Sequence, residues 1–113
     1  PPFERLIVMN NKQLANTFTL IANLLEIKGE IIYKTLAYRK AAESAEEGSR
    51  EWVGAQEMVV DTLAQLGYRF PEEMVRRGQA VLPYLHPADE WHAALTAYVE
   101  RAQALLREGK RLN

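Results

Sequence analysis

The sequence contains no cysteine, which excludes a disulfide framework, a thiolate metal site and a thiol nucleophile. It has no Gly-x-Gly segment, so a glycine loop that cradles phosphate is excluded too. The longest uncharged apolar stretch, residues 14–25, is too short to span a bilayer, and residues 1–9 lack the basic start of a signal peptide. A net charge of −1 gives no global attraction to nucleic acid or to an anionic membrane. We therefore expect a soluble, cytoplasmic protein.

The composition is that of one globular domain. The chain has 113 residues, of which 48% are hydrophobic and 26% charged, so we expect a single domain over residues 1–113. Residue usage changes near residue 45, because all five isoleucines precede that point, lysine falls from four residues to one, and arginine rises from two to seven. The exchanged residue types serve similar roles, so the joint change predicts two sequence sources joined near residue 45. Uneven usage within one natural gene is the alternative.

Apolar residues recur at helical spacing through most of the chain, whereas the alternation of a half-buried strand is nearly absent. Glycines and prolines mark the expected helix ends. The sequence therefore predicts an all-α, single-domain bundle of about five helices joined by short Gly/Pro turns, over residues 11–28, 30–47, 49–66, 71–82 and 87–108.

Individual residues define these ends. Gly29 and Gly109 are expected to terminate the first and last helices, and Ser49 to cap the third. Pro71 suits the first position of the fourth helix, which Pro83 should keep short because proline lacks a backbone donor.

The apolar stripes of these helices define the expected core. Gly54 lies inside the third helix, where it costs about 1 kcal/mol relative to alanine, and this indicates a close helix approach at that position. Residues 1–9 could add a short helix or an extended flap. We expect the following side chains to be mostly buried: Leu14, Phe18, Ile21, Leu25, Leu36, Tyr38, Trp52, Val59, Leu63, Leu95, Tyr98 and Leu105.

Residues 11–44 carry a resemblance, most clearly in the segment YKTLAYRKAA at residues 33–42. They resemble the opening helices of the N-terminal lyase domain of family X DNA polymerases. The resemblance implies that Lys34 and Tyr38, which share one helix side, help to hold the 5′-phosphate of gapped DNA, and Arg39 and Lys40 would widen the basic surface. Judged from the residues alone, the first pair is a lysine extended beside a half-buried tyrosine.

The resemblance ends at residue 44. The family continues with a glycine hairpin of the helix-hairpin-helix type and a helix that carries a Schiff-base lysine, but the only lysine beyond residue 40 is Lys110. Schiff-base chemistry needs an activated lysine amine. We therefore expect no lyase activity, and we assign no catalytic residue and no cofactor.

One group of residues has the composition of a metal site. His86 and His92 have Asp89 and Glu90 between them, but metal-binding pairs on a helix are spaced three or four residues apart. These histidines are six apart and would lie on different sides of a helix. We predict that His86 belongs to a helix start and that no metal is bound.

Three functions remain open. The leading interpretation is a designed or recombined helical protein, built from natural helix-loop-helix pieces, with no evolved biochemical activity, no required partner and a monomeric state. The first alternative is a DNA-binding domain related to the polymerase lyase module, with Lys34, Tyr38, Arg39 and Lys40 as its contacts. The second is a helical protein-interaction domain in which the stripe within residues 91–105 is the partner surface.

Overall fold

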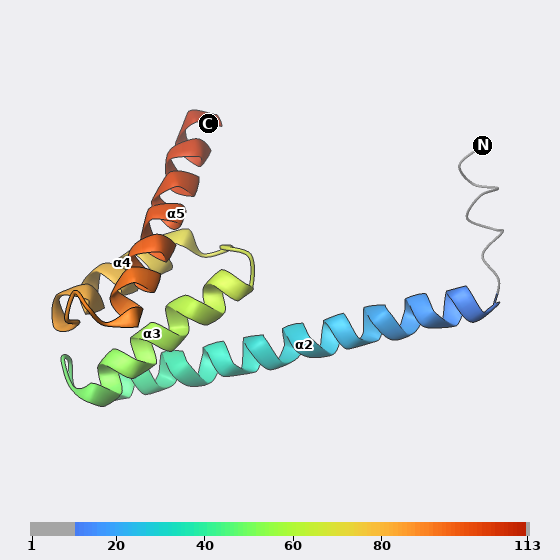
Figure 1. Ribbon diagram of the computed structural model, residues 1–113, viewed down its shortest axis with the longest axis horizontal. Coiled ribbons are helices and arrows are strands. Elements are labelled where there is room, and N and C mark those ends of the chain that lie inside the picture. Colours follow the sequence, from blue (N-terminus) through green and yellow to red (C-terminus); the bar gives the residue numbers. More distant parts are fainter. Residues whose placement is uncertain (1–10, 113) are drawn as a thin grey trace. The chain divides into compact units, whose positions relative to one another are not determined.

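The computed structural model describes the backbone of residues 11–112 and the side chains of residues 11–109. The expectation for residues 1–9 therefore lies outside the described residues. Within the described range the chain is all-α, as predicted, with four α-helices and one short 3₁₀ helix (Figure 1). Their bounds are α2 Asn11–Ser44, α3 Arg50–Gln65, α4 Pro71–Val81, η1 Leu82–Tyr84 and α5 Glu90–Leu112.

The prediction of five helices is wrong because Gly29 does not end a helix. Residues 11–44 form one helix, and the left-handed glycines of the described residues are Gly48, with φ 85°, and Gly67, with φ 87°. A glycine inside a helix costs about 1 kcal/mol, which the good helix formers around Gly29 offset. Gly109 likewise lies inside α5, which continues to Leu112, so its predicted role as a terminator is also wrong.

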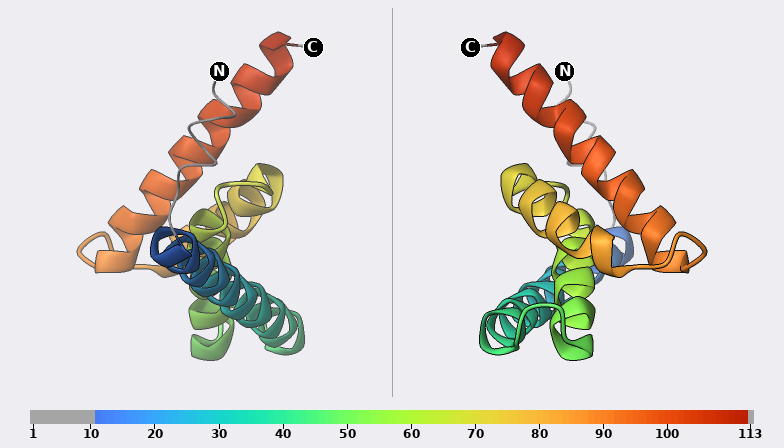
Figure 2. Two further views of the ribbon diagram at one scale, coloured as in Figure 1. Left: turned by 90° about the vertical axis from the view of Figure 1, so that its right-hand side faces the viewer. Right: turned by 90° about the vertical axis from the view of Figure 1, so that its left-hand side faces the viewer.

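The chain divides into two units, Pro1–Glu30 and Ile31–Asn113. In the first unit the described residues form one helical segment, the beginning of α2. The second unit contains the end of α2, α3, α4, η1 and α5, and Figure 2 shows α3, α4 and α5 as three crossing helices. The expected single domain and the expected seam near residue 45 stay predictions.

The core of the second unit is formed mainly by α3, α4 and α5. Its side chains are apolar, closely packed and almost completely inaccessible to solvent. They include Val59, Val60, Leu63, Met74, Val81, Leu95 and Ala102. The predicted core positions Trp52, Val59, Leu63 and Leu95 are confirmed as buried, and Tyr38, Tyr98 and Leu105 are partly buried.

Five other predicted core residues are wrong, because they are exposed: Leu14, Phe18, Ile21, Leu25 and Leu36. The first four lie in the first unit, whose described residues form a single helix with no second described element to cover it. Leu36 lies in the second unit, but there the buried residues of α2 are Thr35 and Ala42. These two are seven residues apart on one helix side, and Leu36 is directed away from it.

The predicted starts of α3 and α4 and the shortening of α4 by proline are confirmed, whereas the helix predicted over residues 87–108 spans Glu90–Leu112. Ser49 caps α3 by accepting a hydrogen bond from the Trp52 amide at 3.2 Å, and Pro71 is the first residue of α4. Pro83 lies in η1, directly after α4 ends at Val81. These assignments succeed because each depends on the backbone chemistry of one residue and its nearest neighbours.

The close helix approach occurs at Gly78 and not at Gly54, where it was predicted. A Cβ atom added at Gly54 would meet nothing within 4 Å, whereas one added at Gly78 would lie 2.3 Å from Val99 Cγ2. Gly78 therefore lets the backbone of α4 approach α5 closely, and Gly54 is simply an unfavourable residue inside α3.

Alanine substitutions at these two glycines should change stability in opposite directions. Gly54→Ala should stabilise the protein by up to about 1 kcal/mol, because alanine is the better helix former and its methyl group enters open space. Gly78→Ala should destabilise it by about 1–3 kcal/mol, because the methyl group overpacks the contact with Val99. Equilibrium urea unfolding followed by tryptophan fluorescence measures both. A stabilising Gly78→Ala would contradict the close approach of α4 and α5.

Candidate functional site

The residues predicted to contact DNA do not form one phosphate site. Lys34 and Lys40 are exposed, and Tyr38 packs against the hydrophobic core of the second unit. Arg39 is held by Glu73 of α4, to which its Nε and Nη2 atoms donate at 2.9 and 2.5 Å. Arg39, which was predicted to widen the basic surface, is therefore already engaged by a carboxylate.

Arg39, Glu73 and Arg77 form an ion-pair cluster that the sequence analysis did not identify. Arg77 is only 6% exposed, and its Nε donates to Glu73 Oε2 at 2.8 Å. Its Nη1 atom donates to Gln56 Oε1 of α3, also at 2.8 Å. The cluster connects α2, α3 and α4. In the described residues, every buried side-chain nitrogen and oxygen atom has a hydrogen-bond partner.

The ionisation of the cluster follows from its geometry. Burial by itself raises the pKa of the Glu73 carboxyl, but hydrogen bonds from Arg39 and Arg77 outweigh burial and hold that pKa below its ordinary value. The hydrogen bond to Glu73 correspondingly raises the pKa of the Arg39 guanidinium. A carboxylate held ionised between two guanidinium groups is a poor general acid or base. The cluster therefore has a structural role.

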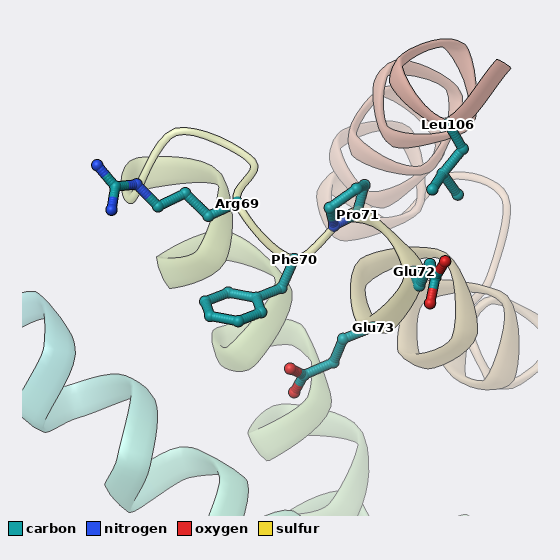
Figure 3. Close-up of a pocket in the computed structure, with 6 residues that line it drawn as sticks. All are labelled: Arg69, Phe70, Pro71, Glu72, Glu73 and Leu106. Atoms are coloured by element: carbon teal, nitrogen blue, oxygen red, sulfur yellow. The ribbon is translucent and has the colours of Figure 1, made fainter. Parts of the chain in front are cut away.

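A shallow depression of about 370 Å³ lies beside this cluster. Figure 3 shows its lining side chains, with Arg69 directed away from Leu106 and from Glu73. The guanidinium of Arg39 lies 5.4 Å from the centroid of the Phe70 ring, and the Glu73 oxygens already accept hydrogen bonds. The Arg39 guanidinium and the Glu73 carboxylate are thus engaged in contacts within the second unit. The lining residues are Arg69, Phe70, Pro71, Glu72, Glu73 and Leu106.

Tyr98 and Asp61 form a second polar contact, between α5 and α3. The Tyr98 hydroxyl donates to Asp61 Oδ1 at 2.7 Å, and Gln65 donates to Asp61 Oδ2 at 2.8 Å. The hydrogen bond to Asp61, together with burial, raises the pKa of Tyr98 to about 12. The phenol therefore stays protonated at neutral pH and connects two helices.

The residues considered for metal binding shape the beginning of α5. Asp89 Oδ1 accepts a hydrogen bond from the Trp91 amide at 2.9 Å, and His86 Nδ1 accepts one from the Ala88 amide at 2.9 Å. Both side chains thus satisfy backbone donors before or at the first turn of the helix. In the part of the chain that the structure describes, no group of three or more metal-ligating side chains comes together.

The stripe within residues 91–105 faces inward. Leu95 and Ala102 are completely buried, and Trp91 and Tyr98 pack against the core. This stripe, which sequence reasoning offered as a partner surface, is therefore occupied by α3 and α4. The amphipathic spacing was recognised correctly, but spacing alone does not say which molecule covers a face.

Exposed apolar side chains are grouped instead on the first part of α2. Leu14, Phe18, Ile21 and Leu25, here called the α2 stripe, recur at intervals of four, three and four residues on one helix side. Phe18 and Leu25 are 61% and 65% exposed. Other large apolar residues of the same segment are exposed as well: Leu20, Leu24 and Ile27. The spacing signalled an apolar face, but not that this face is exposed.

The ion-pair cluster predicts a difference between two neighbouring glutamates. Glu73→Gln should destabilise the protein by about 1–3 kcal/mol, because it removes charge-assisted hydrogen bonds from two arginines. Glu72→Gln, also in the first turn of α4 but exposed, should change stability by about 0.5 kcal/mol or less. Both glutamates lie in the first turn of α4 and interact with the same helix dipole. The difference between the two stability changes therefore measures the contribution of the ion pairs that only Glu73 makes.

The effect of Glu73 should depend on pH. The pKa of Glu73 is lowered from 4.5 in the folded protein, so its contribution is complete above about pH 4.5 and is lost as the pH falls through the lower, folded value. Urea unfolding therefore should show a larger difference between the wild type and Glu73→Gln at pH 7 than at pH 3. A difference that persists unchanged at pH 3 would contradict the ionic account.

No protein-family model, no curated protein and no solved structure matches this chain. The resemblance of residues 11–44 to the polymerase lyase domain stays a prediction. Within residues 11–112, no helix combines the length and the apolar composition needed to cross a membrane.

Proposed function

We propose that this chain is a helical protein-interaction module. In this proposal, residues 31–113 fold as a helical scaffold, and the α2 stripe binds a helix of another protein molecule. The observation that carries the proposal is the exposure of Leu14, Phe18, Ile21 and Leu25, because contiguous exposed apolar patches mark interaction sites. No catalytic step is part of the proposal.

Helix energetics support an intermolecular role for this segment. An isolated helix is marginally stable in water, and most helical stability comes from packing of an apolar face. Each leucine, isoleucine or phenylalanine of the stripe would contribute about 1.5–3 kcal/mol on full burial. A partner helix supplies that burial in the way that amphipathic helices are commonly recognised, through anchors spaced three and four residues apart.

Recombination of unrelated pieces and DNA binding have less support, whereas the design of the whole chain is compatible with the ion pairing described next. A recombined protein without evolved activity would join unrelated pieces near residue 45, yet Arg39 before that point forms a two-bond ion pair with Glu73 after it. Such matched pairing favours segments that were selected or designed together. DNA binding through Lys34, Tyr38, Arg39 and Lys40 is disfavoured, because Arg39 and Tyr38 are engaged within the second unit.

Photo-crosslinking tests the interaction. A photoreactive phenylalanine analogue in place of Phe18 should give intermolecular adducts, whereas the same analogue in place of Asn23 should not, because residue 23 lies on the opposite helix side. Adding Ile21→Gln should abolish the adducts from position 18, and adding Thr19→Gln should leave them intact. The adducts are measured by intact mass, with the purified chain and with the extract of its expression host.

The intact masses of the photo-crosslinked products also identify the result that would reject the interaction. If position 18 gives only intramolecular products, or gives no more adduct than position 23, the stripe does not bind another molecule. The proposal would then be withdrawn whatever the identity of the expected partner.

A further inference from the structure

We infer that the occupant of the α2 stripe is a second copy of this chain, paired with the first in antiparallel orientation. The inference rests on the proposed interaction function and names its partner. Two features of the described residues carry it: the symmetric spacing of the stripe and the charge of the residue that follows it.

The stripe is self-complementary under a two-fold axis. Its residues are spaced four, three and four apart, so the order of the intervals is the same in both directions. In an antiparallel pair, Leu14 of one copy therefore meets Leu25 of the other, and Phe18 meets Ile21. Each interaction occurs twice, which is the property of a closed, isologous dimer interface. Four consecutive apolar layers result, with no polar residue among them.

The residues that flank the stripe decide the orientation. Asn11 lies three residues before Leu14, and Lys28 lies three residues after Leu25. In the antiparallel pair, Lys28 of one copy meets Asn11 of the other, and the asparagine side-chain oxygen can accept a hydrogen bond from the ammonium group. A parallel pair in register would place Lys28 directly beside the second copy's Lys28 in the same layer, where like charges repel.

Polar layers at both ends also fix the register. A shift of the antiparallel pair by one heptad would bring Lys28 against Phe18 in one direction and Asn11 against Ile21 in the other, so either shift would place a polar residue in an apolar layer. Single polar residues at such positions are a common determinant of register and orientation in helical pairs. The opposite side of the segment mixes polar residues, Asn16, Asn23 and Glu30, with the apolar Leu20 and Ile27, whereas the stripe from Leu14 to Leu25 has no polar residue among its layers.

The absence of native cysteine allows a direct test of orientation. Two variants of the full chain are made, Leu14→Cys and Leu25→Cys, and each is oxidised mildly, alone and in a mixture. The antiparallel pairing predicts that the mixture forms a disulfide-linked dimer of the two variants, whereas neither variant alone crosslinks efficiently. Efficient crosslinking of Leu14→Cys with itself would overturn the proposal in favour of a parallel pair. Crosslinking in none of the three samples would overturn it as well.

Sedimentation equilibrium of the wild type gives the independent measurement. We expect association that depends on concentration and that Phe18→Gln weakens by about a hundredfold or more, because the substitution removes two buried rings from each dimer. The matched control Asn23→Gln should associate like the wild type. Urea unfolding followed by tryptophan fluorescence should be unchanged for the second unit of both variants, since its core lies within residues 31–113.

The two proposals can fail separately. A wild-type chain that stays monomeric, but gives adducts from position 18 with another protein of the extract, would overturn self-pairing and leave the interaction function in place. A chain that gives neither self-association nor intermolecular adducts would overturn both the self-pairing and the interaction function.

Discussion

The buried guanidinium of Arg77 is the constraint on which the second unit depends. A buried charge is very costly unless it is paired and hydrogen-bonded, and Arg77 meets that condition only when Glu73 and Gln56 are both in place. Glu73 in turn binds Arg39 of α2. Three helices are thus held in one arrangement, because any shift that separates α2, α3 or α4 leaves a charge without its partner. The apolar core supplies the larger driving force for folding, but apolar contacts define the relative positions of the helices less specifically than paired charges do.

The beginning of α2 obeys a different constraint. A single helix cannot cover its own apolar face, and Phe18 and Leu25 have no other described element of their unit to pack against. The same periodicity that places Leu95 in a core therefore produces an exposed stripe here. The proposed interaction function rests on this difference, and the symmetric spacing of the stripe, with Lys28 at one end, is the reason for which we infer a second copy as its occupant.

The sequence predicted the features that depend on local backbone chemistry. Ser49, Pro71 and Pro83 act at helix ends as expected, and the inward faces of α3 and α5 were identified from the helical spacing of the apolar residues that include Leu63 and Leu95. The failures have two origins. Gly29 continues a helix because its helix-forming neighbours outweigh the cost of one glycine. Gly78 and not Gly54 makes the close contact, and Leu14 and Phe18 are exposed, because spacing along a helix does not show what lies next to a residue in space.

The most direct test of the account is amide hydrogen exchange measured over a range of chain concentrations. Helical amides are protected to the extent that packing stabilises them. We predict that protection of residues 14–25 increases with concentration, while protection of Val59, Val60 and Leu63 stays constant because their core is intramolecular. Equal protection of residues 14–25 at every concentration would contradict the claim that this segment depends on a second molecule.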